Sequence, residues 1–139
     1  MHFQAIGYVQ NRFDEPVRPD VLLGAQSRIV LEPDLGEGLL GLEAGQKILV
    51  IFHFHRFEGQ EYELHQHPRG DRSRPKRGVF ALCSPHRPNA IGATVVELLA
   101  VDANTLQVMG LDAINGTPVL DIKPADYVCA SYDANGDAE

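Results

Sequence analysis

Polar residues suited to binding a ligand are concentrated in the segment GVFALCSPHRPNAIG, residues 78–92. It places Ser84, His86, Arg87 and Asn89 close together and stiffens them with two prolines. Proline fixes φ and removes an amide donor, so a loop of this composition holds a set shape. Such a loop either packs a corner of the fold or presents polar groups to a ligand, and the segment alone does not separate these two interpretations.

A second segment, LDAINGTPVLDIKP at residues 111–124, carries two carboxylates around an Asn-Gly turn. Asp112 precedes the turn, and Asp121 follows it with Lys123 two residues later. A carboxylate near a reacting group can accept a proton, so both aspartates are candidate general bases. For Asp121 the simpler interpretation is an exposed salt bridge to Lys123, which contributes little to stability.

Six histidines raise the question of a metal site. His53 and His55 alternate along one expected strand, and His65 and His67 along another, so each pair would point to one face. The sequence contains no H-E-x-x-H motif, and no carboxylates are grouped with these histidines. We therefore expect no metal site, and we keep a metal-dependent hydrolase as a minor alternative.

The segment PRGDRSRPKR, residues 68–77, is a local concentration of positive charge on an acidic chain. The whole chain has a formal charge of −7, whereas this segment has a single acid, Asp71. Neutralisation of phosphates dominates affinity for nucleic acids, so a basic loop is a candidate contact surface, although a solvated loop would have the same composition. Its basic residues are Arg69, Arg72, Arg74, Lys76 and Arg77.

The sequence predicts that the fold that positions these residues is mostly β. Turn signals recur at short intervals between runs rich in Val, Ile, Leu and aromatic residues, which favours a β-barrel or sandwich. Residues 102–104 predict a tight hairpin turn, and the glycine-rich residues 35–45 allow one or two helical turns. The expected strands are Phe3–Val9, Gln26–Leu31, Lys47–Phe54, Tyr62–His67, Gly78–Leu82, Thr94–Val101, Thr105–Leu111 and Val119–Lys123.

Length and composition predict one domain over residues 1–130, followed by a frayed acidic tail at residues 131–139. No apolar run approaches the roughly 18 residues that a membrane-spanning helix needs, so no membrane association is expected. Cys83 and Cys129 lie far apart without a C-x-x-C spacing, which argues against a disulfide framework. The expected location is therefore the cytoplasm.

Taken together, the segments 78–92 and 111–124 resemble the paired signature of the TsaA-like proteins. IGYVQNRF at residues 6–13 and KILVIFHFHR at residues 47–56 fit the same family in order and spacing. The resemblance implies an all-β fold, a single-sheeted β-barrel with short helical or irregular connections, and a homodimer. It also implies S-adenosylmethionine as methyl donor and threonylcarbamoyladenosine in tRNA as acceptor.

The resemblance further implies which residues serve each role. The family places the Asp112 turn beside the donor, which makes Asp112 the first candidate general base and Asp121 the second. Arg87 joins the basic loop as a candidate tRNA contact because its guanidinium charge is fixed. The chain departs from the family pattern at Cys83, where an arginine is usual, at the small Ala93, and at Asn115, where an aspartate is common. The loss of that arginine keeps open a protein that binds the donor as a sensor without turnover. The implied donor contacts are Pro16, Val17, Arg18, His55, Arg56, Cys83, Ala93, Asp112, Ala113, Ile114 and Asn115.

Overall fold

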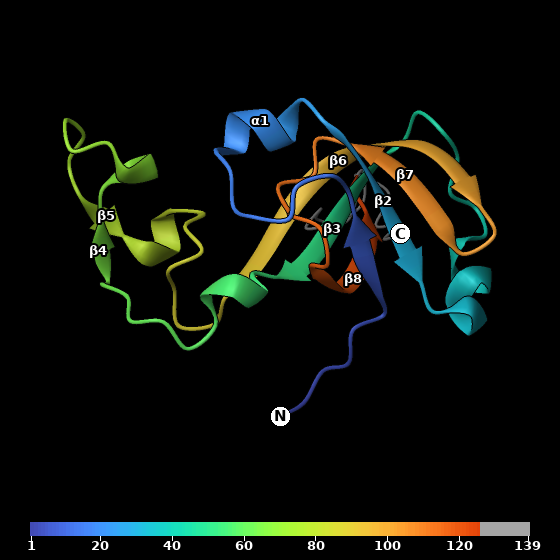
Figure 1. Cartoon of the computed structure of the whole chain (residues 1–139), viewed down its shortest axis with the longest axis horizontal. Coiled ribbons are helices and arrows are strands. Elements are labelled where there is room, and N and C mark those ends of the chain that lie inside the picture. Colours follow the sequence, from blue (N-terminus) through green and yellow to red (C-terminus); the bar gives the residue numbers. More distant parts are fainter. Residues whose placement is uncertain (126–139) are drawn as a thin grey trace, which may run out of the picture.

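The computed structural model describes residues 1–125, which form a closed, fully antiparallel β-barrel of six strands. The strand order around the barrel is β1-β2-β7-β6-β3-β8, and β8 pairs with β1 to close it (Figure 1). The predicted all-β barrel is thus confirmed. The expected tail at residues 131–139 and Cys129 lie outside the described residues. The barrel strands are β1 (Gly7–Gln10), β2 (Gln26–Leu31), β3 (Lys47–His53), β6 (Ile91–Asp102), β7 (Thr105–Met109) and β8 (Pro118–Pro124).

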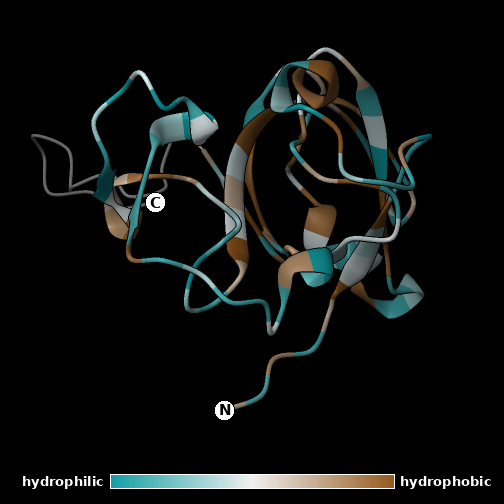
Figure 2. Ribbon diagram, turned by 60° about the vertical axis from the view of Figure 1, so that its left-hand side comes forward, coloured by the Kyte–Doolittle hydropathy of each residue, from teal (hydrophilic) through white to brown (hydrophobic). Residues whose placement is uncertain are grey.

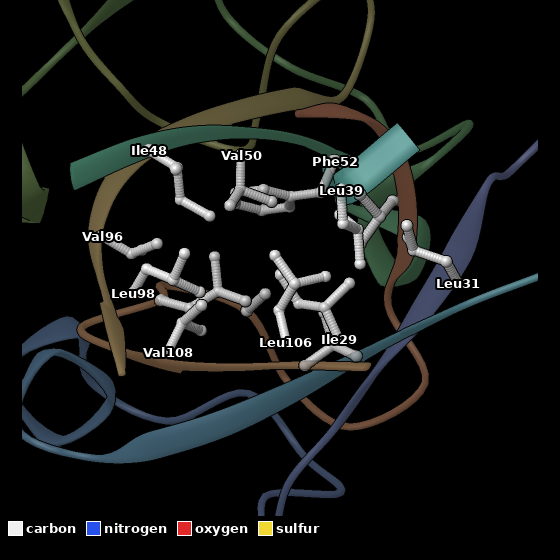
Figure 3. Close-up of a cluster of buried hydrophobic side chains, with 14 residues drawn as sticks. Ile29, Leu31, Leu39, Ile48, Val50, Phe52, Val96, Leu98, Leu106 and Val108 are labelled. Carbon is white, nitrogen blue, oxygen red and sulfur yellow. The ribbon is translucent and has the colours of Figure 1, made fainter. Parts of the chain in front are cut away.

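The barrel interior is filled by apolar side chains that alternate with outward-facing residues along each strand. In β3, Ile48, Val50 and Phe52 are fully buried, whereas the residues between them are more exposed. They meet Leu98 of β6 and Leu106 of β7 across the interior (Figure 3). The period of two in the sequence therefore corresponds to the inner and outer faces of the barrel wall.

The hairpin predicted around residues 102–104 is present between β6 and β7. The left-handed backbone falls on Ala103, with φ of 53°, whereas the prediction rested on its polar neighbours. Asn104 instead donates a side-chain hydrogen bond to the Leu31 carbonyl. β6 is longer than expected because its first half pairs with β3 and its second half with β7, with a register shift between Leu98 and Ala100.

The helices are short connections of at most seven residues, so within residues 1–125 no helix could span a membrane. The helical turns expected at residues 35–45 are found a few residues earlier, in η1. The helices are α1 (Pro19–Leu23), η1 (Pro33–Leu39), η2 (His55–Phe57), η3 (Pro68–Gly70) and η4 (Val79–Ala81).

Residues 58–89 form an arm that stands beside the barrel (Figure 1). Its only sheet is the two-stranded pair of β4 (His65–Gln66) and β5 (Arg77–Gly78). Most residues between 58 and 78 are exposed, and Figure 2 shows this part of the arm as largely hydrophilic. Without an apolar face to bury, longer strands gain little here, and the strand predicted at Tyr62–His67 is only β4. The strand predicted at Gly78–Leu82 is wrong, because β5 ends at Gly78 and residues 79–81 form the helical turn η4.

Two further predictions about strand ends are wrong. The first strand begins at Gly7 and not at Phe3, whose side chain is exposed. β3 ends at His53, and Phe54 turns the chain (φ −71°, ψ 71°) into η2, so His53 and His55 do not share one strand face. Strand extent depends on partners distant in sequence, which local pattern does not supply.

Candidate functional site

Three segments that are far apart in the sequence meet at one end of the barrel. The Arg56 guanidinium lies 2.7 Å from Glu15 Oε2 and donates a second hydrogen bond, of 3.2 Å, to the Asp14 carbonyl. Asn115 Nδ2 donates to Asp14 Oδ1 at 3.0 Å. The structure thereby joins the loop after β1, the start of η2 and the turn before β8. Of these residues, the sequence analysis had not singled out Asp14 and Glu15, although both lie next to the predicted Pro16.

The turn at residues 112–115, which we call the donor turn because donor contacts are predicted there, is largely buried and carries one carboxyl group. Ala113 and Ile114 are buried, and their carbonyls accept hydrogen bonds from the Asn11 side chain and the Thr117 hydroxyl. Both polar side-chain atoms of Asn115 are used in hydrogen bonds to residues 11 and 14. The Thr117 hydroxyl donates to the Ile114 carbonyl at 2.7 Å and braces the turn from behind.

Asp112 is the titratable group of this turn. Its burial raises the pKa of the carboxyl above the ordinary value, and the positive charge of Arg69 in the arm acts in the opposite direction. A raised pKa makes the ionised carboxylate a stronger base. Asp112 is thus suited to take a proton from a bound acceptor.

Asp121 has a different environment on the outer face of β8. It forms an ion pair of 3.0 Å with Lys123, in which both side chains are about half exposed. It also accepts the Ile122 amide at 2.9 Å. The salt bridge expected as the simpler interpretation is therefore present, and a role for Asp121 as a base stays a prediction.

Ala93 lies on the same outer face as Asp121. Both residues oppose Ile51 of β3, from the β6 and β8 sides respectively, so the three form one row across the barrel wall. On β6, Ile91 and Val95 flank Ala93, and both are exposed, by 44% and 51%. This part of the outer face is therefore apolar and exposed to solvent, and it lies beside the ion pair of Asp121 with Lys123.

The segment around Cys83 forms a braced loop. Arg87 donates from one guanidinium nitrogen to the carbonyls of Leu82 and Ser84, at 3.0 and 3.1 Å, on either side of Cys83. The Cys83 thiol is free and exposed. Within residues 1–125, no hydrogen bond joins Cys83 or Ala93 to the cluster of Glu15, Arg56 and the donor turn. Arg87 is half-buried and partly engaged, so only its remaining donors could contact a phosphate.

The other predicted donor contacts occupy the rim of this region. Pro16, Val17 and Arg18 are exposed in the loop before α1, where Arg18 pairs with Asp20 at 3.3 Å. Partial burial lowers the pKa of His55 below its ordinary value; a hydrogen bond to the backbone of His53 acts in the opposite direction, and the charge of Arg56 in the same one.

The remaining histidines make separate local contacts. His53 Nε2 lies 3.5 Å from Glu58, and His67 Nδ1 lies 2.8 Å from the Arg74 carbonyl. In the part of the chain that the structure describes, no three potential ligands of the His, Cys, Asp or Glu type are grouped for a metal ion.

The basic loop is exposed but folded. Asp71 accepts hydrogen bonds from the Ser73 hydroxyl and amide, at 2.6 and 2.9 Å, and the hydroxyl bond in particular lowers the pKa of Asp71. Only Lys76 has a carboxylate within ion-pair distance among the described residues, Glu63 at 4.0 Å. The four arginines are exposed and carry their charge into solvent: Arg69, Arg72, Arg74 and Arg77.

Comparisons with known proteins bear on what such a site does. The family model described as the tRNA-methyltransferase O N-terminal domain matches residues 7–133. A probable S-adenosyl-L-methionine-binding protein of Pyrococcus abyssi is 35% identical over 128 residues, 88% of this chain and 66% of that protein. A human tRNA (adenine(37)-N6)-methyltransferase is 36% identical over 142 residues, 94% of this chain and 31% of that protein.

Solved structures agree with these matches. A crystal structure of TrmO superposes with a TM-score of 0.70 at 34% identity, covering 96% of this chain and 62% of that one. The chain thus spans less than two thirds of that structure and about a third of the human relative.

Proposed function

Because this chain belongs to the tRNA-methyltransferase O N-terminal domain family, we propose that it is an S-adenosylmethionine-dependent tRNA methyltransferase. The observation that carries the proposal is the convergence of Glu15, Arg56 and Asn115, in segments where donor contacts were expected. Side-chain hydrogen bonds between residues 41 and 101 positions apart in the sequence hold these loops together. Unrelated surface loops would not need such bonds.

The residues present fit this donor. Its sulfonium and ammonium groups are positive, and the donor turn offers the half-buried Asp112 carboxyl as a partner of opposite charge. When bound, the donor supplies an activated methyl group and its own leaving group, so the protein needs no covalent nucleophile. What the chain itself must do is hold donor and acceptor in line.

The proposed proton acceptor is Asp112. With the donor bound, an acceptor nitrogen that took the methyl group would have to lose a proton, and the donor's sulfur would take the electron pair of the broken carbon–sulfur bond. The raised pKa of Asp112 suits its carboxylate to accept that proton. Asp121 is the second candidate, weakened by its ion pair with Lys123.

We propose the exocyclic nitrogen of threonylcarbamoyladenosine in tRNA as the acceptor, and the basic loop as the main phosphate-contacting surface. Four exposed arginines that make no ion pair with residues 1–125 suit this role because a guanidinium keeps its charge at all relevant pH values. Arg87 would contribute only through the donors that its internal hydrogen bonds leave free.

A homodimer in the cytoplasm is the proposed working form. The exposed apolar residues Ile91 and Val95 would be covered if a second copy packed on this face of the barrel. Ala93, an expected donor contact, lies between them, so such packing would place the donor near a subunit interface.

A second candidate, a donor-binding sensor without turnover, is favoured by one observation. Cys83 stands where the family usually has an arginine, and its exposed thiol carries no positive charge to fix the donor or acceptor. The protein would then still bind the methyl donor, but it would not align the donor with an acceptor for methyl transfer.

Two measurements test these functions. Calorimetry with S-adenosylmethionine in the presence of a chelator should show binding; loss of binding that zinc restores would point to a metal enzyme instead. Transfer of a labelled methyl group should occur to tRNA that carries the threonylcarbamoyl modification and not to tRNA that lacks it. Binding without transfer to either tRNA would favour the sensor.

A further inference from the structure

Asn11, which follows β1 and was not among the expected donor contacts, uses all of its side-chain polar atoms on the scaffold of the site. Its Nδ2 donates to the Ala113 carbonyl at 2.9 Å and to the Ser27 hydroxyl at 3.0 Å. Its Oδ1 accepts the Phe13 amide at 3.0 Å. One amide group therefore ties together the first strand, the second strand and the donor turn.

Asn115 completes the connection from the turn. Its Oδ1 accepts the Asn11 backbone amide at 3.1 Å, and its own backbone amide donates to the Phe13 carbonyl at 2.7 Å. Its Nδ2 donates to Asp14 Oδ1 at 3.0 Å. Asp14 in turn accepts Arg56 at its backbone carbonyl. These contacts connect the turn to the loop that leads to Pro16.

The barrel ladder alone does not fix the donor turn. β7 ends at Met109 and β8 begins at Pro118, so residues 110–117 lie outside the strands. Two backbone bonds with Val9 hold residues 116 and 117 to β1, whereas residues 113 and 115 are held to the segment after β1 by bonds of Asn11 and Asn115. Loss of one such side-chain bond would let the turn shift while the barrel stays folded.

We propose that Asn11 is a positioning residue for the donor turn, and that Asp14 and Asn115 form a matched carboxylate–amide pair that locks this turn to the loop after β1. The inference rests on the proposed donor site. This pair requires an amide N–H group on one residue to donate a hydrogen bond to a carboxylate on the other. Two carboxylates at 3.0 Å would repel and could not both ionise.

The test measures affinity for S-adenosylmethionine by calorimetry in four variants. Asn11→Ala removes the side-chain bond to the Ala113 carbonyl, and Asn115→Asp removes the bond to Asp14. Each should weaken binding about tenfold, the free-energy scale of one hydrogen bond to the turn. The exchange Asp14→Asn with Asn115→Asp restores an amide opposite a carboxylate and should recover most of the affinity. An unchanged affinity in folded Asn11→Ala, or no recovery in the exchange, would overturn the proposal.

Asn104→Ala is the matched control. It also loses a side-chain bond to a backbone carbonyl, that of Leu31, but at the β6–β7 hairpin and away from the turn. It should lower stability while leaving donor affinity unchanged. Equal weakening in Asn104→Ala and Asn11→Ala would show a merely structural role and contradict the proposal.

Hydrogen exchange separates this inference from the proposed function. Asn11→Ala should speed exchange of the Asn115 and Gly116 amides, which bond to Phe13 and Val9. If the unmodified protein binds no S-adenosylmethionine, the proposed function fails, and faster exchange still supports the positioning role. Unchanged exchange at both amides refutes the positioning role whether or not the donor binds.

Discussion

Replacing Arg72 and Arg74 by alanine tests whether the basic loop contacts tRNA. Both side chains are exposed and make no ion pair within residues 1–125, so little stability should be lost. The fold of the loop should survive, because His67 contacts the backbone carbonyl of Arg74 and Ser73 bonds to Asp71. Each phosphate contact contributes roughly 0.7–0.9 to the slope of log affinity against log salt concentration, so two lost contacts flatten it by about 1.4–1.8.

The assay is tRNA binding at a series of salt concentrations. Over a fourfold rise, from about 50 to 200 mM, the unmodified protein should lose roughly 7- to 12-fold more affinity than the variant. The control replaces Arg12 and Arg28, which are exposed in and beside the barrel strands and change the net charge equally. If the loop variant keeps the unmodified slope, or if both variants flatten alike, the loop is not the tRNA surface.

Three further predictions follow from the barrel and the site. Gly92→Ala should lower the free energy of unfolding by about 1–3 kcal/mol, because its Cβ would lie 2.5 Å from the Phe52 ring; Gly38→Ala, with nothing within 4 Å, is the control in denaturant titrations, and equal losses would contradict this packing. Asp112→Asn should abolish most methyl transfer. Burial raises the pKa of Asp112 in the folded state, so its ionisation lowers the stability of the protein as the pH rises from the pKa of the unfolded state through that of the folded state. The variant should therefore have a higher melting temperature than the unmodified protein at neutral pH and an equal one at low pH. A lower melting temperature at neutral pH would refute this. Val95→Glu should convert a dimer to a monomer of about 15.3 kDa in sedimentation, and a monomer already in the unmodified protein would remove the dimer proposal.

Local patterns in the sequence were sufficient for much of the barrel. The alternation through Ile48, Val50 and Phe52 identifies a strand with one buried face, because side chains on a strand repeat every two residues. The hairpin at residues 102–104 and the turn before Pro118 were likewise readable from adjacent residues. The two motif segments also indicated the family, which the match over residues 7–133 confirms.

Only the tertiary structure decided which residues hold the site together. Arg56 and Glu15 are separated by 41 residues, and Asn115 and Asn11 by 104, so no local pattern pairs them. The arm shows the same limit: the strand expected at Tyr62–His67 is only His65–Gln66, and most of the strand expected at Gly78–Leu82 is the helical turn η4. The alternation of side chains along a strand depends only on neighbours in sequence. Strand pairing, strand extent and the raised pKa of Asp112 depend on residues distant in sequence that come into contact when the barrel closes.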